Sequence, residues 1–132
     1  MNRIAIVEDD QGYRDTLFIY IKQYEQERDT AFEATPFEKA DDFLAVYNGD
    51  YDIILMDIMM PIMDGLEAAR QIRSSNRADG LAVPIIAMSA NAFEEDIEKS
   101  LAAGMNEHLI KPLDGSEVSD TMKKYLANKI VK

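Results

Sequence analysis

Five side chains with distinct chemistry follow short apolar runs of the sequence: Glu8, Asp9, Asp57, Ser89 and Lys111. Carboxylate oxygens are ligands that Mg²⁺ prefers, and Mg²⁺ often completes its coordination shell with phosphate oxygen. A hydroxyl group and an ammonium group can hold the remaining oxygens of a phosphoryl group. If folding brings these side chains together, they form a phosphoryl-transfer site in which Asp57 is the nucleophile.

The central candidate is Asp57, which ends the apolar run 53–56. This run is too short for an ordinary helix, and Pro61 and Gly65 predict a loop after it, so the run is typical of a strand buried on both faces. Ligands of open α/β sheets bind at the carboxyl ends of the strands, which is where Asp57 falls. Taken alone, the stretch is equally compatible with an acid that caps the next helix or accepts from a loop amide.

Strands and helices alternate along the rest of the chain. Five strands are predicted, at 3–7, 30–35, 53–56, 83–88 and 107–110. The second is expected to be a short edge strand that ends near Pro36. Apolar residues at helical spacing predict a helix from Tyr13, one with Ala40, Phe43, Leu44 and Tyr47, one over 66–73, one that places Phe93, Ile97 and Leu101 together, and one from about Ser116. Residues 74–80 are expected to form a polar loop.

This alternation predicts an α/β fold of the flavodoxin-like, doubly wound type: a five-stranded parallel sheet with right-handed crossovers and helices on both faces. In the strand order 2-1-3-4-5, the first and third strands are neighbours at the switch point, so Glu8, Asp9 and Asp57 would converge. Three crowded carboxylates repel one another unless a cation joins them. The sequence therefore predicts a Mg²⁺ site at this edge of the sheet.

Length and composition exclude several other classes of protein. The 132 residues, 47% of them hydrophobic, fit a single domain spanning 1–132. With no cysteine and one histidine, the sequence has no thiolate site and no histidine-rich zinc site. A net charge of −11 disfavours direct binding to nucleic acid or an anionic membrane. Without a long apolar stretch or a signal peptide, we expect a cytoplasmic protein.

Five motifs occur in a fixed order along the chain: I-A-I-V-E-D-D, D-I-M-M-P-I-M-D-G, P-I-I-A-M-S-A, A-A-G-M-N and I-K-P-L. Together they resemble the receiver domains of bacterial two-component response regulators, which also occur in hybrid histidine kinases. The resemblance implies that Asp57 is the phosphoacceptor and that Ser89 and Lys111 contact the phosphoryl group. It also implies that Glu8 and Asp9 are the acidic pair around Mg²⁺ and that Met59 offers its backbone carbonyl to the metal. By the same resemblance, His108 is the switch residue.

The resemblance also implies a regulatory domain and not a turnover enzyme. Such a domain accepts a phosphoryl group from a sensor histidine kinase or a phosphotransfer protein, and it catalyses its own phosphorylation and dephosphorylation. Ser89 and His108 would then change the surface of the fourth helix, fifth strand and fifth helix, which is the candidate surface for a partner or a homodimer. For Met105, Val118 and Met122, two interpretations stay open: they contribute to that surface, or they belong to the ordinary core. We also expect a cis peptide bond between Lys111 and Pro112.

Three rival functions share parts of this pattern. A flavodoxin-type FMN binder would need a phosphate loop rich in Ser, Thr and Gly after the first strand, where this chain has three acids. Phosphatases similar to the haloacid dehalogenases carry a second acid two residues after the nucleophile, where this chain has Met59. A degenerate receiver would only bind partners, but here the phosphorylation set is complete. Asp10 is predicted to cap the first helix, and Asp64 to be a loop or helix-start acid; neither is predicted to bind metal.

Overall fold

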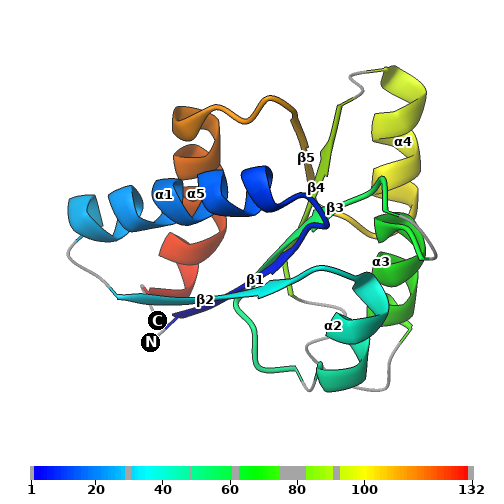
Figure 1. The fold of residues 1–132 in the computed structure, drawn as a ribbon, viewed down its shortest axis with the longest axis horizontal. Coiled ribbons are helices and arrows are strands. Elements are labelled where there is room, and N and C mark those ends of the chain that lie inside the picture. The colour runs from blue at the N-terminus through cyan, green and yellow to red at the C-terminus, as the bar shows by residue number, and fades with distance from the viewer. Residues whose placement is uncertain are drawn as a thin grey trace.

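The computed structural model describes residues 2–28, 31–47, 49–60, 63–74, 83–90 and 93–130. Along these residues, five strands alternate with five helices (Figure 1). The strands are β1 (Asn2–Val7), β2 (Phe32–Phe37), β3 (Ile53–Asp57), β4 (Ile85–Ser89) and β5 (Glu107–Ile110). The helices are α1 (Gln11–Arg28), α2 (Ala40–Val46), α3 (Gly65–Arg73), α4 (Glu94–Ala102) and α5 (Gly115–Ile130).

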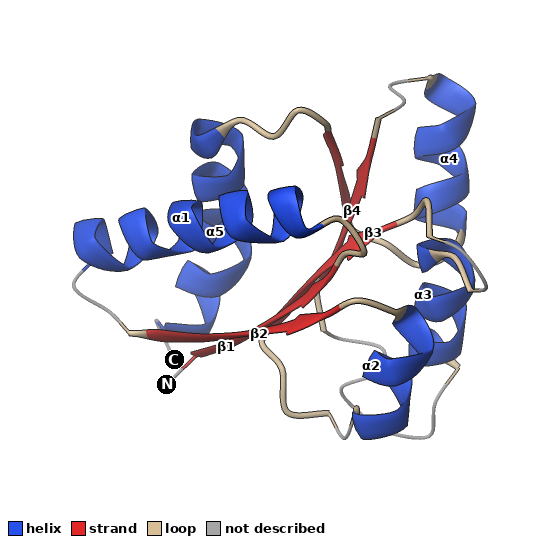
Figure 2. Ribbon diagram, viewed as in Figure 1, coloured by secondary structure: helices blue, strands red, loops and turns tan. Residues whose placement is uncertain are grey.

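The strands form one parallel sheet in the order β2-β1-β3-β4-β5. Helices α1 and α5 cover one face of the sheet, and α2, α3 and α4 cover the other (Figure 2). Because all five strands run in the same direction, their carboxyl ends lie at one edge. The predicted doubly wound, flavodoxin-like fold with strand order 2-1-3-4-5 is confirmed.

The central strand β3 is buried along its whole length because helices cover both faces of the sheet. Successive side chains of a strand point to opposite faces. Ile54 and Met56 accordingly join the core under α2 and α3, whereas Ile53 and Leu55 join the core under α1 and α5. Packing on both sides fixes the direction of β3, and this fixes the position of Asp57 at its end.

The loop from β3 to α3 folds back closely over the end of the strand, and Gly65 permits this approach. A Cβ atom at Gly65 would lie 2.9 Å from the Cα of Ile58. The backbone N–H of Gly65 donates to the Ile58 carbonyl at 3.3 Å. A larger side chain would therefore push the loop away from Asp57, so this glycine helps to shape the site.

Two strands differ by two residues in their bounds from the sequence prediction. β2 ends near Pro36, as predicted, but it spans Phe32–Phe37 and not 30–35. The carbonyl of Phe37 accepts from the Glu8 N–H at 3.0 Å. Because β2 is an edge strand, one of its sides makes no ladder hydrogen bonds and a proline is tolerated. β4 begins at Ile85, directly after Pro84. Thr30 of the predicted second strand and residues 75–80 of the predicted polar loop lie outside the described residues.

Helix α4 packs on the sheet with less apolar surface than its spacing suggests. Phe93, at the N-cap position, and Leu101 are 66% and 54% exposed, and Ile97 is half-buried. The fully buried residue of this helix is Ser100. The apolar face formed by Phe93 and Leu101 is therefore a surface feature of the molecule. Within the described ranges, no helix is long and apolar enough to cross a membrane.

Candidate functional site

A pocket of about 360 Å³ opens at the carboxyl edge of the sheet, where the loops after β1, β3, β4 and β5 meet. Its lining residues are Glu8, Asp9, Asp10, Tyr13, Asp57, Met59, Ala90 and Lys111. One carboxylate oxygen from each of Glu8, Asp9 and Asp57 lies within 4.8 Å of the others. The structure thus brings together the three acids that the strand order predicts to be neighbours.

Lys111 supplies the positive charge of this pocket. Its Nζ lies 2.7 Å from Glu8 Oε1 and 3.5 Å from Asp57 Oδ2, and the side chain is nearly buried. The ammonium group also lies over the ring of Tyr13, 4.2 Å from the ring centroid, which is a cation–π contact. The peptide bond between Lys111 and Pro112 is cis, as expected. Lys111 is therefore held between two acids and one aromatic ring.

The carboxyl groups of Glu8 and Asp57 are both buried, and burial is the largest influence on their pKa values. It raises the pKa of Glu8 to about 7, against the opposing effect of Lys111. Burial also raises the pKa of Asp57, although the Met59 N–H, which donates to Asp57 Oδ1 at 3.1 Å, and the ammonium of Lys111 favour the ionised form. Lys111 alone therefore does not offset the cost of burying these two carboxylates in their ionised form.

The same surroundings also raise the pKa of Lys111, but for a different reason. Burial alone would lower the pKa of its ammonium group, but the contacts with Glu8 and Asp57 outweigh burial and raise the pKa above its ordinary value. Lys111 is therefore a permanent cation over the physiological pH range. It can remain charged when a phosphoryl group replaces the charge of the Asp57 carboxylate.

A divalent cation fits the donor set of this pocket. All three acids offer oxygen, which suits Mg²⁺. Glu8 Oε1 is buried, and its 2.7 Å contact with Lys111 is an ion pair outside hydrogen-bond geometry, so within the described part of the chain this oxygen accepts no hydrogen bond. A metal ion would use the free lone pair of this oxygen and would reduce the repulsion among the three carboxylates. Glu8, Asp9 and Asp57 would hold the ion, and Met59 lies on the same pocket wall.

Ser89 ends β4 and is buried, and its hydroxyl is engaged with the predicted switch residue. Ser89 Oγ lies 2.7 Å from His108 Nε2. The other ring nitrogen, Nδ1, lies 3.1 Å from the hydroxyl of Ser100 on α4. The backbone N–H of Lys111 donates to the Ser89 carbonyl at 2.7 Å, which ties the end of β5 to the end of β4. Ser89 and His108 are thus in direct contact.

The two acids predicted to start helices do so. Asp10 Oδ1 accepts from the backbone N–H of Tyr13 at 3.1 Å, at the start of α1. Asp64 is the N-cap of α3, and its side chain accepts from the Glu67 N–H at 2.9 Å. Both use their carboxylates on unpaired N–H groups of a first helical turn. Asp10 also lines the pocket, but the cluster of converging acids comprises Glu8, Asp9 and Asp57.

Sequence reasoning missed three residues around the site. Tyr13 was predicted only to begin a helix, but its ring covers Lys111. Arg14 donates from Nη1 to the Glu8 carbonyl at 2.8 Å and so supports the backbone of that acid. Ser100 was not singled out, although a lone serine at a core-facing helical position is a signal for a buried hydrogen bond. Met105, Val118 and Met122 are buried, so the core interpretation is confirmed for them and the contribution to a partner surface is not.

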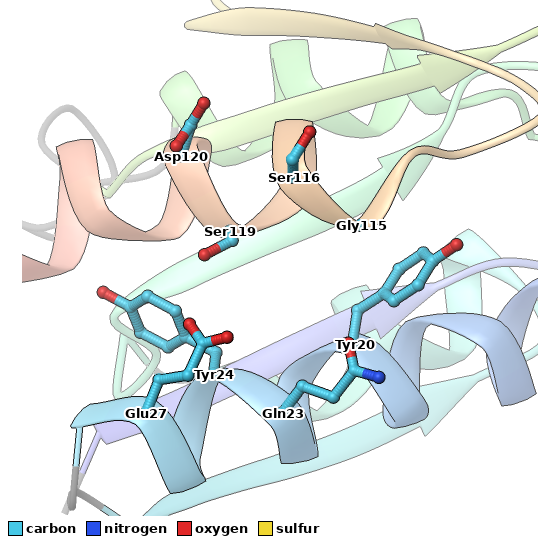
Figure 3. A pocket seen from close by; sticks show the side chains of 8 residues that line it. All are labelled: Tyr20, Gln23, Tyr24, Glu27, Gly115, Ser116, Ser119 and Asp120. Atoms are coloured by element: carbon cyan, nitrogen blue, oxygen red, sulfur yellow. The ribbon is translucent and has the colours of Figure 1, made fainter.

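A second pocket of about 360 Å³ lies between α1 and α5 and shares no lining residue with the acidic pocket (Figure 3). It forms where Gly115 leaves room for the ring of Tyr20, because a Cβ atom at Gly115 would lie 2.9 Å from Tyr20 Cε1. The Tyr20 hydroxyl donates to the Leu113 carbonyl at 3.2 Å. This pocket lacks the combination of converging acids and a cation, so we assign the chemistry to the acidic pocket.

Comparison with known proteins gives one consistent result. The family model described as the response regulator receiver domain matches residues 4–123. Transcriptional regulatory protein ResD of Bacillus subtilis is 32% identical over 117 residues, which is 88% of this chain and 44% of that protein. Probable histidine kinase 1 of Oryza sativa subsp. indica is 37% identical over 111 residues, with 62% of this chain and 12% of that protein covered. The chain thus spans less than half the length of these relatives.

Solved structures give the same result for the fold. The receiver domain of a sensor histidine kinase from Pseudomonas aeruginosa superimposes with a TM-score of 0.80 at 30% identity, covering 96% of this chain and 98% of that one. That protein has a magnesium ion coordinated in its active-site cleft. A response regulator from Chloroflexus aurantiacus superimposes with a TM-score of 0.83 at 21% identity, covering 96% and 98%.

Proposed function

This chain belongs to the response regulator receiver domain family, and we propose that it transmits a signal by accepting a phosphoryl group on Asp57 in a Mg²⁺-dependent reaction. The phosphoryl donor is a phosphorylated histidine of a sensor histidine kinase or a phosphotransfer protein. The observation that carries the proposal is the pocket in which three carboxylates converge beside the ammonium group of Lys111. Receiver domains are regulatory phosphoacceptor domains of two-component and phosphorelay systems.

Asp57 performs the bond-forming step. One of its carboxylate oxygens attacks phosphorus, and a new P–O bond forms as the bond between phosphorus and the donor imidazole nitrogen breaks. The imidazole leaves with the bonding electron pair. The Met59 N–H orients the nucleophile by its hydrogen bond to Asp57 Oδ1. Fixing the carboxylate in this way lowers the entropic part of the barrier.

The groups around Asp57 would balance the negative charge of the phosphoryl group. Glu8, Asp9, the Asp57 carboxylate and the Met59 carbonyl would hold Mg²⁺, which supplies neutralisation of the phosphoryl oxygens when bound. Lys111 already lies 3.5 Å from Asp57 Oδ2 and can contact a phosphoryl oxygen attached there. Tyr13 holds the ammonium group from the outer side. Because these parts belong to the receiver itself, we propose that the domain catalyses its own phosphorylation and dephosphorylation.

A small phosphodonor provides the direct test of this function. Incubation with acetyl phosphate and Mg²⁺ is expected to add one phosphoryl group, as seen by intact-protein mass spectrometry. Prior treatment with EDTA should prevent the addition, and an excess of Mg²⁺ should restore it. If acetyl phosphate and phosphoramidate both leave the mass of the protein unchanged in the presence of Mg²⁺, the proposed function is wrong.

The surface of α4, β5 and α5 is the proposed site for a partner or a second copy of the chain. Phe93 and Leu101 are the exposed apolar residues that α4 and its N-cap offer there. The net charge of −11 argues against direct contact with nucleic acid or an anionic membrane. We place the reaction in the cytoplasm, together with the kinase or phosphotransfer protein that supplies the phosphoryl group.

The lifetime of the aspartyl phosphate is expected to depend on Met59. Its side chain is 63% exposed and lines the pocket next to Asp57, where a water molecule must approach phosphorus. An apolar side chain cannot orient that water, whereas an amide can. Met59→Asn should therefore shorten the lifetime of the phosphorylated protein several-fold, measured as loss of the added mass after the donor is removed.

A matched control for this prediction is Val46→Asn, because Val46 is similarly exposed but ends α2 and is not among the lining residues of the pocket. Its decay rate should equal that of the unmodified sequence. Asn91, which we expect on the other side of the water path, lies outside the described residues. Equal decay rates for Met59→Asn and Val46→Asn would show that Met59 does not guard the site.

A further inference from the structure

Ser89, His108 and Ser100 form a hydrogen-bonded chain that runs from the carboxyl end of β4 to α4. Ser89 Oγ and His108 Nε2 are 2.7 Å apart, and Ser100 Oγ and His108 Nδ1 are 3.1 Å apart. Ser89 is buried, His108 is half-buried and Ser100 is fully buried. Three elements of the fold, β4, β5 and α4, are thus joined through one imidazole ring.

The positions of the hydrogens in this chain follow from counting donors. The Ser100 hydroxyl has a single hydrogen, and it donates that hydrogen to the Asp96 carbonyl at 3.1 Å, because a carbonyl can only accept. The contact of Ser100 with His108 is therefore one in which Nδ1–H donates. A neutral imidazole carries one N–H, so Nε2 must accept, and the donor to Nε2 is the Ser89 hydroxyl.

This arrangement commits the hydrogen of Ser89 to His108 Nε2. A phosphoryl oxygen on Asp57 needs a donor, and the Ser89 hydroxyl becomes one only when its hydrogen leaves His108. If His108 takes up a proton, both ring nitrogens donate, to Ser100 and to Ser89, and the Ser89 hydrogen is released. Rotation of the neutral ring would instead break both hydrogen bonds of a half-buried side chain.

We propose that Ser100 is a positioning residue that fixes His108 as the Nδ1–H tautomer, and that the Ser89 hydroxyl turns to a phosphoryl group on Asp57 as His108 takes up a proton. The inference rests on the proposed function for its second half only, because the tautomer is a property of the unphosphorylated protein. Phosphorylation of Asp57 and protonation of His108 are then linked events. Each favours the other by the same factor.

Most charged side chains on the elements packed around β5 are acidic. His108 lies on the sheet face covered by α4, because its neighbour Leu109 packs on the opposite face. The charged residues of the packing elements are Glu94, Glu95, Asp96, Glu98 and Lys99 on α4, Glu107 on β5, Glu117, Asp120, Lys123 and Lys124 on α5, and Asp57 and Lys111 beyond Ser89. Helix α5 covers the opposite face, where Lys124 pairs with Glu107 at 2.6 Å. The acids of α4 outnumber its lysine, and a phosphoryl group adds negative charge beside Ser89.

The single histidine of the sequence allows a direct measurement. Long-range ¹H–¹⁵N correlation spectra distinguish the two neutral tautomers and the imidazolium ion by the shifts of the ring nitrogens. In the unphosphorylated protein, about one pH unit above the ordinary histidine pKa of ~6.5, we expect the Nδ1–H tautomer. Ser100→Ala should lose this preference, and Ser100→Thr, which restores a hydroxyl, should recover it.

A matched control comes from α5. The Thr121 hydroxyl donates to the Glu117 carbonyl at 2.8 Å, the same kind of helix contact that Ser100 makes, but on the other face of the sheet. Thr121→Ala should therefore leave the His108 tautomer unchanged while it removes a comparable hydrogen bond. A wild-type ring in the Nε2–H form, or a tautomer that is the same in Ser100→Ala as in the wild type, would overturn the role of Ser100.

The second half of the proposal is tested by adding beryllofluoride and Mg²⁺ at the same pH. We expect the ring nitrogens of His108 to move to imidazolium shifts as the backbone amide signals around Asp57 change. The ring signals are the readout because Glu8 titrates in the same pH range. Amide changes with a ring that stays neutral would overturn the linkage and leave the proposed function intact. Absence of any amide change would contradict the proposed function and the linkage together, and the tautomer of the unliganded protein would still decide the role of Ser100.

Discussion

Replacing Asp57 with asparagine is expected to abolish labelling of the chain by acetyl phosphate and Mg²⁺. Asparagine has nearly the same shape and can still accept the hydrogen bond from the Met59 N–H, which reaches Asp57 Oδ1 at 3.1 Å. Its amide, however, lacks the anionic oxygen that attacks phosphorus. Intact-protein mass spectrometry should therefore show no added phosphoryl group in Asp57→Asn, under conditions that label the unmodified protein.

The matched control is Asp10→Asn. Asp10 lines the same pocket but caps α1, and asparagine is an equally good N-cap, so labelling should persist. Asp57→Asn should also remain folded, because it removes a buried carboxyl group whose pKa burial has raised. Labelling that survives in Asp57→Asn would show that another side chain is the nucleophile.

The second large effect concerns stability in the absence of metal. The pKa of Glu8 is raised by burial to about 7 from an ordinary value of 4.5, so the folded state binds this proton more tightly than the unfolded state does. The stability that the protonated form contributes is fully present below about pH 4.5 and is lost as pH rises toward 7. The loss is at most about 3 kcal/mol for a shift of this size.

Mg²⁺ is expected to reverse this loss, because it binds the ionised carboxylates. At a free concentration of 100 Kd, the ion stabilises the folded state by about 2.7 kcal/mol. Thermal denaturation should show a large increase in Tm on adding Mg²⁺ above pH 7 and little change near pH 5. The Glu8→Gln variant should lose the pH dependence between these values and most of the response to Mg²⁺. A Tm that responds to Mg²⁺ equally at both pH values would contradict the assigned site.

The sequence was sufficient for those features that follow from strand ends. Short apolar runs at regular spacing specify parallel strands, and the residue after each run must lie at the carboxyl edge of the sheet. This reasoning placed Asp57 beside Glu8 and Asp9 before any contact was known. The predicted range of β2 was shifted by two residues, because the strand continues through Pro36, which an edge strand tolerates and a central strand does not.

Other features depend on tertiary contacts that one sequence does not display. The buried position of Ser100 follows from its contact with His108 across α4 and β5, two elements joined only by a short turn. The contact between the Tyr13 ring and the Lys111 ammonium group connects α1 to the end of β5. Exposure of Phe93 and Leu101 likewise could not be deduced from helical spacing, because spacing identifies a shared face but not the direction that it points.

The central claim, that the phosphoryl group is carried by Asp57, is tested most directly by locating the group chemically. Borohydride reduces an acyl phosphate to an alcohol, so a phosphorylated aspartate becomes homoserine and an unmodified carboxylate does not react. Peptide mapping of the reduced protein after labelling with acetyl phosphate and Mg²⁺ is expected to show homoserine at position 57 and aspartate at positions 9 and 10. Homoserine at another position, with an unchanged aspartate at 57, would contradict the account.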